Sequence, residues 1–155
     1  MADAAPGTSS RPVGELLPRA GIKLGLASTD RADAVAQAGA LLVELGAVQP
    51  AYADAMQERE AMVSSYVGEQ FAIPHGTNDA RALVNRPCLA FLQFPDGIDW
   101  EGQDVRACIA IAAAADEHVQ VMSTLATILL DPARAEALRT TDDPEVVLAL
   151  LAGDG

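Results

Sequence analysis

The sequence has 155 residues and a formal net charge of −12, and half of its residues are hydrophobic although only 4% are aromatic. A chain of this length forms one domain with a single core, which must be filled mainly by Ala, Val, Leu and Ile. The acidity argues against nucleic acid and anionic membranes as the main partners, because both bind basic surfaces.

The first residues of the chain differ in composition from the rest. Residues 1–12 are small, polar and rich in Pro, Gly and Ser, so we expect a disordered tail, followed by one domain over residues 13–155. This start lacks the cationic and apolar segments of a signal peptide. No apolar run approaches the ~20 residues of a membrane-spanning helix. We therefore expect a cytoplasmic protein.

The first half of the domain alternates between strand and helix patterns. Residues 22–26 alternate in polarity as a strand does, and a helix is predicted from the capping residues 28–30 to a C-terminal cap at Gly46. Pro50 opens a second helix, whose last turns carry Arg59 and Glu60. Hydrophobic residues 71–73 then predict a short buried strand that ends at Pro74-His75-Gly76.

The second half continues this alternation. Residues 88–94 predict a strand, 95–97 a tight turn, and 105–113 a central strand that is buried on both faces. Asp116 is the expected N-cap of the next helix, whose expected apolar face is Val119, Met122, Leu125, Ile128 and Leu129. Pro132 and Pro144 open two short helices, the second capped by Asp142 or Asp143. Strands interleaved with helices predict an α/β fold with a single mixed β-sheet flanked by helices on both faces.

The two cysteines lie inside apolar runs, Cys88 in CLAFLQF and Cys108 in VRACIAIAAAA. We read them as buried, reduced thiols in adjacent strands, which suits a reducing cytosol, and a disulfide between neighbouring strands stays open. Neither cysteine lies in a CxxC context that would mark a reactive thiol.

His75 is the residue best placed for chemistry. It is expected at the C-terminal end of a strand, where α/β folds gather their functional residues. Pro74 pushes the preceding residue toward an extended conformation, and Gly76 lets the backbone turn sharply and leaves space beside the imidazole. The alternative is an ordinary surface histidine in a loop, since Pro-His-Gly is common loop composition.

Two further residues complement His75. His118 is expected in the first turn of its helix, where free amide groups suit a phosphoryl or carboxylate group. Arg59 offers a planar fork of donors for phosphate oxygens, and Glu60 is placed to orient it. The alternatives are a surface histidine near a helix cap and a salt bridge of Arg59 with Glu58, Glu60 or Glu69. Together, His75, His118 and Arg59 favour phosphoryl transfer onto an imidazole, which needs positioned donors and, if the donor is itself a phosphohistidine, no metal.

Other chemistries lack their motifs. The two histidines and nearby acids have no HxH, HExxH or Cys/His spacing, so we expect no metal site. The sequence also lacks GxxxxGK[ST], GxGxxG and GxSxG, and direct use of ATP or NAD is not expected. We therefore predict no cofactor.

The stretch REAMVSSYVGEQFAIPHG, over residues 59–76, resembles the signature of the EIIA domains of the mannitol/fructose class in the bacterial phosphoenolpyruvate-dependent sugar phosphotransferase system. The resemblance extends from about residue 23 to residue 151 and includes FPDGIDW and the segment around DEH. Tyr66 and the turn that carries Trp100 resemble the corresponding positions in the mannitol branch of the class. Ser65 departs from a position that is commonly Thr, which is a conservative change.

The resemblance implies a phosphocarrier with the family's mixed sheet flanked by helices. His75 would accept a phosphoryl group from the phosphohistidine of HPr, as a tele-phosphohistidine, and pass it to a cysteine of EIIB. The membrane component EIIC would then take up the sugar, so that the chain meets a membrane only through EIIC. His118 and Arg59 would stabilise the phosphoryl group, with Glu60 and Gly76 as further binding residues. Because EIIB and EIIC regions do not follow, we expect a free-standing EIIA of the mannitol type.

Two alternatives to the sugar phosphocarrier stay open. One is a regulatory EIIA of the nitrogen-related type, a binding module that acts on a transporter or kinase in one phosphorylation state. Tyr66 argues against this alternative, because nitrogen-related members commonly have Gly-Ile-Gly there. The other is a degenerate EIIA-like domain, which the presence of His75, Arg59 and His118 disfavours.

Overall fold

The computed structural model describes residues 13–113 and 115–151, so the tail expected over residues 1–12 lies outside the described residues. The helices are α1 (Arg31–Glu44), α2 (Ala51–Met62), α3 (Ala115–Leu129), α4 (Pro132–Thr140) and α5 (Pro144–Leu151), with short 3₁₀ helices η1 (Val13–Leu16), η2 (Arg19–Gly21) and η3 (Asn78–Leu83). The strands are β1 (Ile22–Lys23), β2 (Tyr66–Gly68), β3 (Phe71–Ala72), β4 (Cys88–Trp100) and β5 (Gln103–Ala112).

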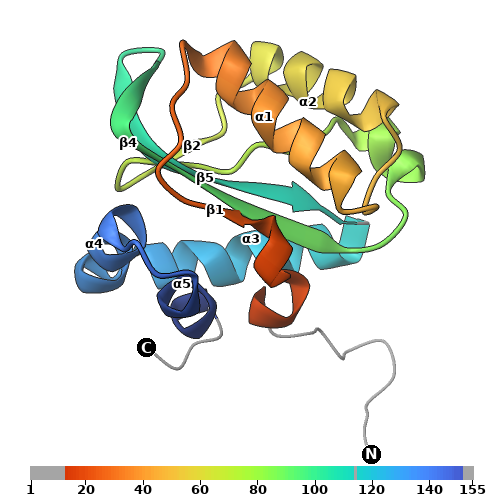
Figure 1. Cartoon of the computed structure of the whole chain (residues 1–155). Coiled ribbons are helices and arrows are strands. Elements are labelled where there is room, and N and C mark those ends of the chain that lie inside the picture. Colours follow the sequence, from red (N-terminus) through yellow and green to blue (C-terminus); the bar gives the residue numbers. More distant parts are fainter. Residues whose placement is uncertain (1–12, 114, 152–155) are drawn as a thin grey trace, which may run out of the picture.

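Three layers make up the molecule. Figure 1 shows α1 and α2 over one face of the sheet and α3, α4 and α5 over the other. The strands form one five-stranded sheet in the order β1-β4-β5-β3-β2, with both parallel and antiparallel pairs. The prediction of an α/β fold with a single mixed sheet between helical layers is confirmed.

The parallel pairing of β3 with β5 brings the predicted site residues His75 and His118 toward one edge of the sheet. Phe71 lies opposite Ala107 and Ala72 opposite Cys108, and an isolated parallel bridge continues the pairing at His75 and Ile111. The carboxyl ends of two parallel strands point to the same edge of a sheet. The loop after β3 and the start of α3 after β5 are therefore brought to one edge.

The helix ends follow the signals in the sequence. Asp30 caps α1 by accepting a hydrogen bond from the amide of Asp33, and Gly46 just beyond its end has a φ of 75°. Asp131 caps α4 in the same way, and the carboxylate of Asp143 accepts from the amide of Glu145 at the start of α5. These short polar side chains satisfy amide groups that have no partner inside the helix.

The prediction of a tight turn at residues 95–97 is wrong, because β4 continues through these residues. The register of β4 against β5 shifts between Gln93 and Ile98, and Gly97 has a φ of 82°, so these residues form an irregularity inside one long strand. The actual turn is at Glu101 and Gly102, which both have positive φ and join paired strands.

Other boundaries differ from the expectations in smaller ways. The strand expected over residues 22–26 is only Ile22–Lys23, and β2 was not predicted, since its three residues show no clear alternation. Asp116 is not the N-cap of α3, because that helix begins at Ala115. Val119 is 68% exposed, and Val121 takes its place among the buried residues, because successive positions turn by about 100° around a helix.

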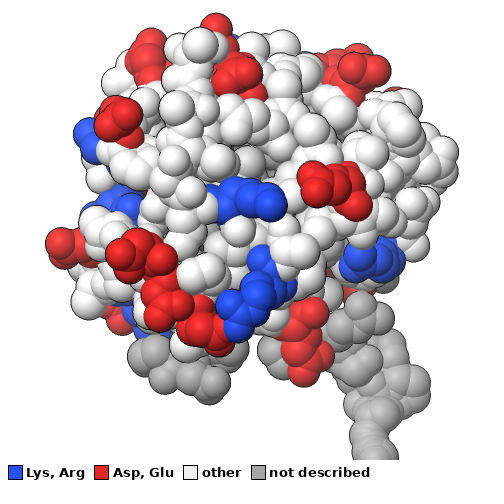
Figure 2. All heavy atoms as spheres, in the orientation of Figure 1, with Lys and Arg blue, Asp and Glu red and all other residues white. Residues whose placement is uncertain are grey.

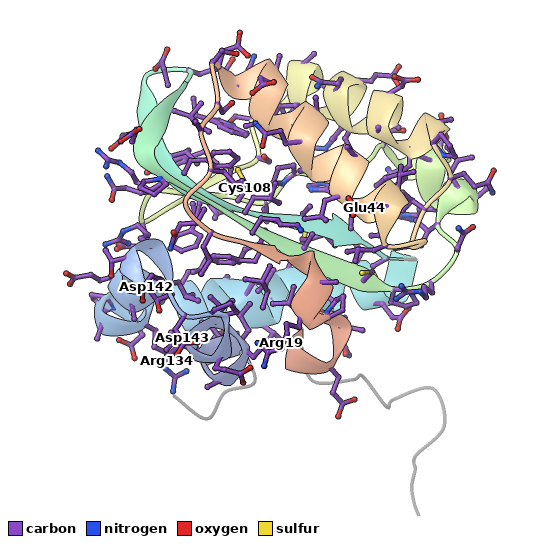
Figure 3. The ribbon with its side chains drawn as sticks, viewed as in Figure 1. Arg19, Glu44, Cys108, Arg134, Asp142 and Asp143 are labelled. Carbon is purple, nitrogen blue, oxygen red and sulfur yellow. The ribbon has the colours of Figure 1, made fainter. Side chains whose placement is uncertain are left out.

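Two hydrophobic clusters fill the spaces on either side of the sheet. One joins the sheet to α1 and α2, and the other joins it to α3, α4 and α5. Cys108 belongs to the first cluster and points toward α1 and α2 in Figure 3. Both cysteines are buried and free, on adjacent strands, as predicted, with Cys108 opposite Leu92 rather than opposite Cys88.

On the face shown in Figure 2, most of the surface belongs to uncharged residues, and the charged side chains are dispersed over it. On the face shown in Figure 2, acidic side chains are spread over the surface with single Lys and Arg side chains between them, and no basic patch forms there. Among the described helices, none is both long enough and apolar enough to cross a membrane.

Candidate functional site

His75 lies in the loop that leaves β3, and its backbone is held against β5. The amide of Ile111 donates to the carbonyl of Pro74 over 3.0 Å, next to the bridge between His75 and Ile111. On the preceding side, the amide of Ile73 donates to the carbonyl of Ser65 over 3.0 Å. The imidazole is therefore carried by backbone that the sheet has already fixed.

The ring of His75 is oriented by its own loop. Its Nδ1 lies 2.8 Å from the carbonyl oxygen of Ile73. A carbonyl oxygen can only accept, so Nδ1 must carry a proton and donate it. In the neutral ring this leaves the lone pair on Nε2, and His75 is fixed in the tautomer that can attack through Nε2.

His75 is only 6% exposed. Nε2 has no hydrogen-bond partner among the described residues. The ring as a whole is therefore buried, and its Nε2 is not held by a hydrogen bond to any described residue.

His118 stands beside His75. The centroids of the two imidazole rings are 4.7 Å apart, and the ring planes are inclined by 60°. His118 lies in the first turn of α3, as expected, and is half-buried. The parallel pairing of β3 with β5 brings together two histidines that are far apart in the sequence.

Arg59 completes the cluster from the last turn of α2. Its Nη1 donates to the carbonyl of Val63 over 2.6 Å, and its backbone carbonyl accepts from the amide of Val63 over 3.2 Å. None of the ion pairs found between the described residues includes Arg59, so the salt bridge with Glu58, Glu60 or Glu69 is not formed. Its charge acts on both histidines.

Both imidazoles are held in the neutral form at neutral pH. Burial lowers the pKa of His75 from the ordinary 6.5, and the charge of Arg59 adds to this, against the hydrogen bond to Ile73 and the charge of Glu60. Burial also lowers the pKa of His118 to about 4, helped by His75, Arg81 and Arg59 in that order. A neutral imidazole is the nucleophilic form.

Glu60 has a different role from the one predicted, because it does not pair with Arg59. Its side chain is buried and accepts hydrogen bonds from the amide of Ser65 (2.9 Å), the hydroxyl of Ser65 (2.6 Å) and the indole N–H of Trp100 (2.8 Å). The carboxylate ties the end of α2 to the loop before β2 and to β4. Glu60 therefore makes no contact with the guanidinium of Arg59. It positions Arg59 by anchoring the end of α2, the helix that carries both residues.

Gly76 also differs from expectation. Its φ is not among the positive values, so the chain makes no sharp turn that requires glycine there. The missing side chain instead makes room for Tyr52, because a Cβ at Gly76 would lie 2.7 Å from Cε1 of the tyrosine ring. The amide of Gly76 donates to the hydroxyl of Tyr52 over 2.9 Å and is thus not free to bind a ligand.

The sequence analysis missed two residues of this site, Tyr52 and Arg81. Tyr52 precedes Arg59 by two turns of α2, so a shared helix face was the available signal. Arg81 lies on η3, which directly follows the His75 loop, and its Nη2 donates to Asn78 over 3.1 Å. Its charge acts on His118 and on Tyr52. The site is accordingly more cationic than the sequence analysis indicated.

The arrangement can accept and stabilise a phosphoryl group. It offers a nucleophilic nitrogen of fixed tautomer, a second imidazole, and guanidinium charge, all of which suit a group whose charge is spread over three oxygens. In the part of the chain that the structure describes, no cluster of three or more His, Cys, Asp or Glu side chains could hold a metal ion.

Comparisons with known proteins agree with this reading. Residues 15–153 match the family model described as phosphoenolpyruvate-dependent sugar phosphotransferase system, EIIA 2. A multiphosphoryl transfer protein of Xanthomonas campestris is 43% identical over 134 residues, which are 86% of this chain and 16% of that protein. The chain thus spans about a sixth of the length of that relative.

Other relatives are similar in length to this chain. The mannitol-specific phosphotransferase enzyme IIA component of Halalkalibacterium halodurans is 39% identical over 130 residues, covering 84% of this chain and 90% of that protein. Among solved structures, the complex of enzyme IIAMTL and phosphorylated enzyme IIBMTL from Escherichia coli contains a similar chain. It matches with a TM-score of 0.82 and 38% identity over 86% of this chain and 94% of that chain.

Proposed function

The chain belongs to the EIIA type 2 family of the phosphoenolpyruvate-dependent sugar phosphotransferase system, and from this premise we propose that His75 is the phosphoryl carrier of a mannitol-type EIIA. The single observation that carries the assignment of His75 is the hydrogen bond from Nδ1 to Ile73, which leaves Nε2 as the nucleophile beside His118. The family match over residues 15–153 supports one EIIA domain over residues 13–155.

In the first step, Nε2 of His75 attacks the phosphorus of phosphohistidine on HPr. A P–N bond forms at Nε2 as the P–N bond of the donor breaks, and the electron pair returns to the donor imidazole. The proton on Nδ1 of His75 stays in place and is held by Ile73. Arg59 and His118 stabilise the charge of the phosphoryl oxygens as it passes between the two nitrogens.

In the second step, the phosphoryl group moves from His75 to a cysteine of EIIB. The thiolate of EIIB attacks the phosphorus, and the electron pair of the broken P–N bond returns to Nε2. The Escherichia coli structure that pairs enzyme IIAMTL with phosphorylated enzyme IIBMTL supports EIIB as the acceptor. In this role the chain works in the cytoplasm and meets the membrane only through EIIC. No cofactor is required, because the donor bond is already activated.

Exposed apolar residues follow Arg59 and His118 in the sequence and suit docking of the two partners. Met62 and Val63 follow Arg59 at the end of α2, and Val119 follows His118 on α3, and all three are well exposed. By contrast, Phe71 and Ile73 are buried in the core. HPr and EIIB must each bring a reacting side chain to the same Nε2, so we propose that both use this apolar rim in turn.

The test is phosphoryl transfer from purified phospho-HPr, followed by transfer to a mannitol-type EIIB. We expect the chain to acquire an acid-labile phosphate, and His75→Gln, which lacks the imidazole, to acquire none. Labelling of His75→Gln equal to that of the unmodified chain would overturn the assignment. Phosphorylation of His75 without transfer to EIIB or sugar would instead favour the regulatory, nitrogen-related alternative.

A further inference from the structure

The hydroxyl of Tyr52 joins two parts of the backbone that flank the site. It accepts a hydrogen bond from the amide of Gly76 over 2.9 Å and donates to the carbonyl of Ile111 over 2.9 Å. Gly76 directly follows His75, and Ile111 is the residue opposite His75 in the parallel bridge. One hydroxyl thus closes the gap between the His75 loop and β5.

The contact of Tyr52 with Gly76 is close as well as polar. A Cβ built at Gly76 would lie 2.7, 2.9 and 3.2 Å from three carbons of the Tyr52 ring. Atoms at such distances overlap, so the ring fills the place that a side chain would occupy. Tyr52 is itself buried, with 3% of its surface exposed, and therefore cannot move aside without disturbing the core.

The two sides of His75 are consequently fixed by different means. On its N-terminal side the carbonyl of Pro74 accepts from the amide of Ile111, which is backbone pairing that any sequence could supply. On its C-terminal side the pairing stops, because the amide of Gly76 is bound by a side chain instead of by β5. Tyr52 replaces the strand pairing that is missing after His75.

We propose that Tyr52 is a positioning residue for phosphoryl transfer at His75, a role that rests on the proposed function. Its hydroxyl holds the peptide after His75 so that Nε2 faces the incoming phosphorus. Misplacing a reacting atom by about 1 Å can cost about 10²-fold in rate. Tyr52 is not a proton donor in the reaction, since its proton is held by Ile111 and burial raises its pKa.

The test compares Tyr52→Phe with Tyr66→Phe. Tyr52→Phe removes the hydroxyl and keeps the ring against Gly76. Tyr66→Phe is the same chemical change at a half-buried tyrosine of β2, and the hydroxyl of Tyr66 has no hydrogen-bond partner among the described residues. Both variants are mixed with phospho-HPr, and single-turnover transfer is followed over a range of donor concentrations from pH 6 to pH 9.

We expect Tyr52→Phe to lower the maximal transfer rate by about 10- to 100-fold, with the donor concentration for half-maximal rate unchanged. The loss should be the same across the pH range, and Tyr66→Phe should transfer as the unmodified chain does. The ¹⁵N signals of His75 should also show that the Nδ1–H tautomer is less populated or exchanges faster in Tyr52→Phe.

Two results would overturn the inference. One is a Tyr52→Phe rate within twofold of the unmodified chain. The other is a loss that merely follows the fraction of unfolded protein, which thermal denaturation of each variant measures. If the unmodified chain takes no phosphate from phospho-HPr, the proposed function fails instead, and the two failures are distinguishable.

A second variant keeps the test decisive if Tyr52→Phe unfolds. Gly76→Ala leaves the hydroxyl in place but pushes its methyl group against the Tyr52 ring. We expect it to lower the transfer rate by a similar factor, because it displaces the same peptide. Transfer by Gly76→Ala at the unmodified rate would show that this contact does not position His75.

Discussion

Nδ1 of His75 donates a hydrogen bond to the carbonyl oxygen of Ile73, two residues earlier in the same loop, over 2.8 Å. The local chain therefore selects the tautomer of the imidazole before any partner binds. Pro74 lies between the two residues and disfavours a helical conformation at Ile73.

The first prediction concerns the atom that is modified. We expect the phosphoryl group on Nε2 of His75, because Nδ1 is occupied by its proton and by Ile73. Long-range ¹H–¹⁵N spectra of the phosphorylated chain identify the substituted nitrogen. A phosphoryl group on Nδ1 would contradict the arrangement, and the spectrum of the unphosphorylated chain, with its Nδ1–H tautomer, is the reference.

The second prediction concerns pH. The pKa of His118 is lowered to about 4 and that of His75 is lowered from 6.5, so both should stay neutral as the pH falls through 6.5. In this range the unfolded chain binds more protons than the folded chain, so the free energy of unfolding should decrease as the pH falls from 6.5 toward 4. NMR titration checks the two pKa values.

Denaturation of His118→Gln as a function of pH provides the control for this prediction. Its stability should change less between pH 6.5 and pH 4 than that of the unmodified chain, because one titrating group is gone. A His118 that titrates near 6.5 would contradict the predicted environment.

The third prediction concerns the groups around the phosphoryl oxygens. Arg59→Ala and His118→Ala should fold and transfer about 10²- to 10³-fold more slowly, since each loses one positioned donor. Arg59→Lys keeps the charge without the fork and should fall between Arg59→Ala and the unmodified chain. Rapid-quench measurement of transfer from phospho-HPr gives the rates. Unchanged rates in both alanine variants would remove Arg59 and His118 from the mechanism.

The fourth prediction concerns the role of Glu60 as an anchor for Ser65 and Trp100. Glu60→Ala should lower the free energy of unfolding by about 3 kcal/mol or more, because Ser65 and Trp100 are left with buried donors that lack an acceptor. Urea denaturation followed by Trp100 fluorescence measures the change. Glu58→Ala, an exposed position on the same helix, should stay within about 0.5 kcal/mol of the unmodified chain. Equal stability of the two variants would refute the anchoring role.

The fifth prediction tests the irregularity in β4. An alanine at Gly97 would overlap the carboxylate of Asp104 and lie 3.0 Å from Nε of Arg106, at a φ of 82°. Gly102 also has a positive φ, but a Cβ there would meet nothing within 4 Å. Gly97→Ala should therefore cost more than Gly102→Ala in thermal denaturation, because the new methyl group displaces the Asp104 carboxylate from its contact with Arg106. Equal losses would mean that crowding at Gly97 is unimportant.

Much of the fold was predictable because its signals are local. Helix periodicity and capping residues gave α1, α4 and α5 within a few residues, and the apolar run after residue 105 gave the central strand β5. The turn at residues 95–97 was misplaced because Pro and Gly favour turns locally, whereas pairing with β5 keeps β4 extended on both sides of them.

The sequence alone determined which side chains are present and how each is held in its own segment, as with His75 between Pro74 and Gly76. Only the tertiary structure decided that His75 and His118 are neighbours. The parallel pairing of β3 with β5 places both residues at one edge of the sheet. The tertiary structure also decided the partners of Glu60 and Tyr52 and the neutral state of both imidazoles. These properties depend on burial and on contacts between distant segments, and local sequence does not encode which segments will pack together.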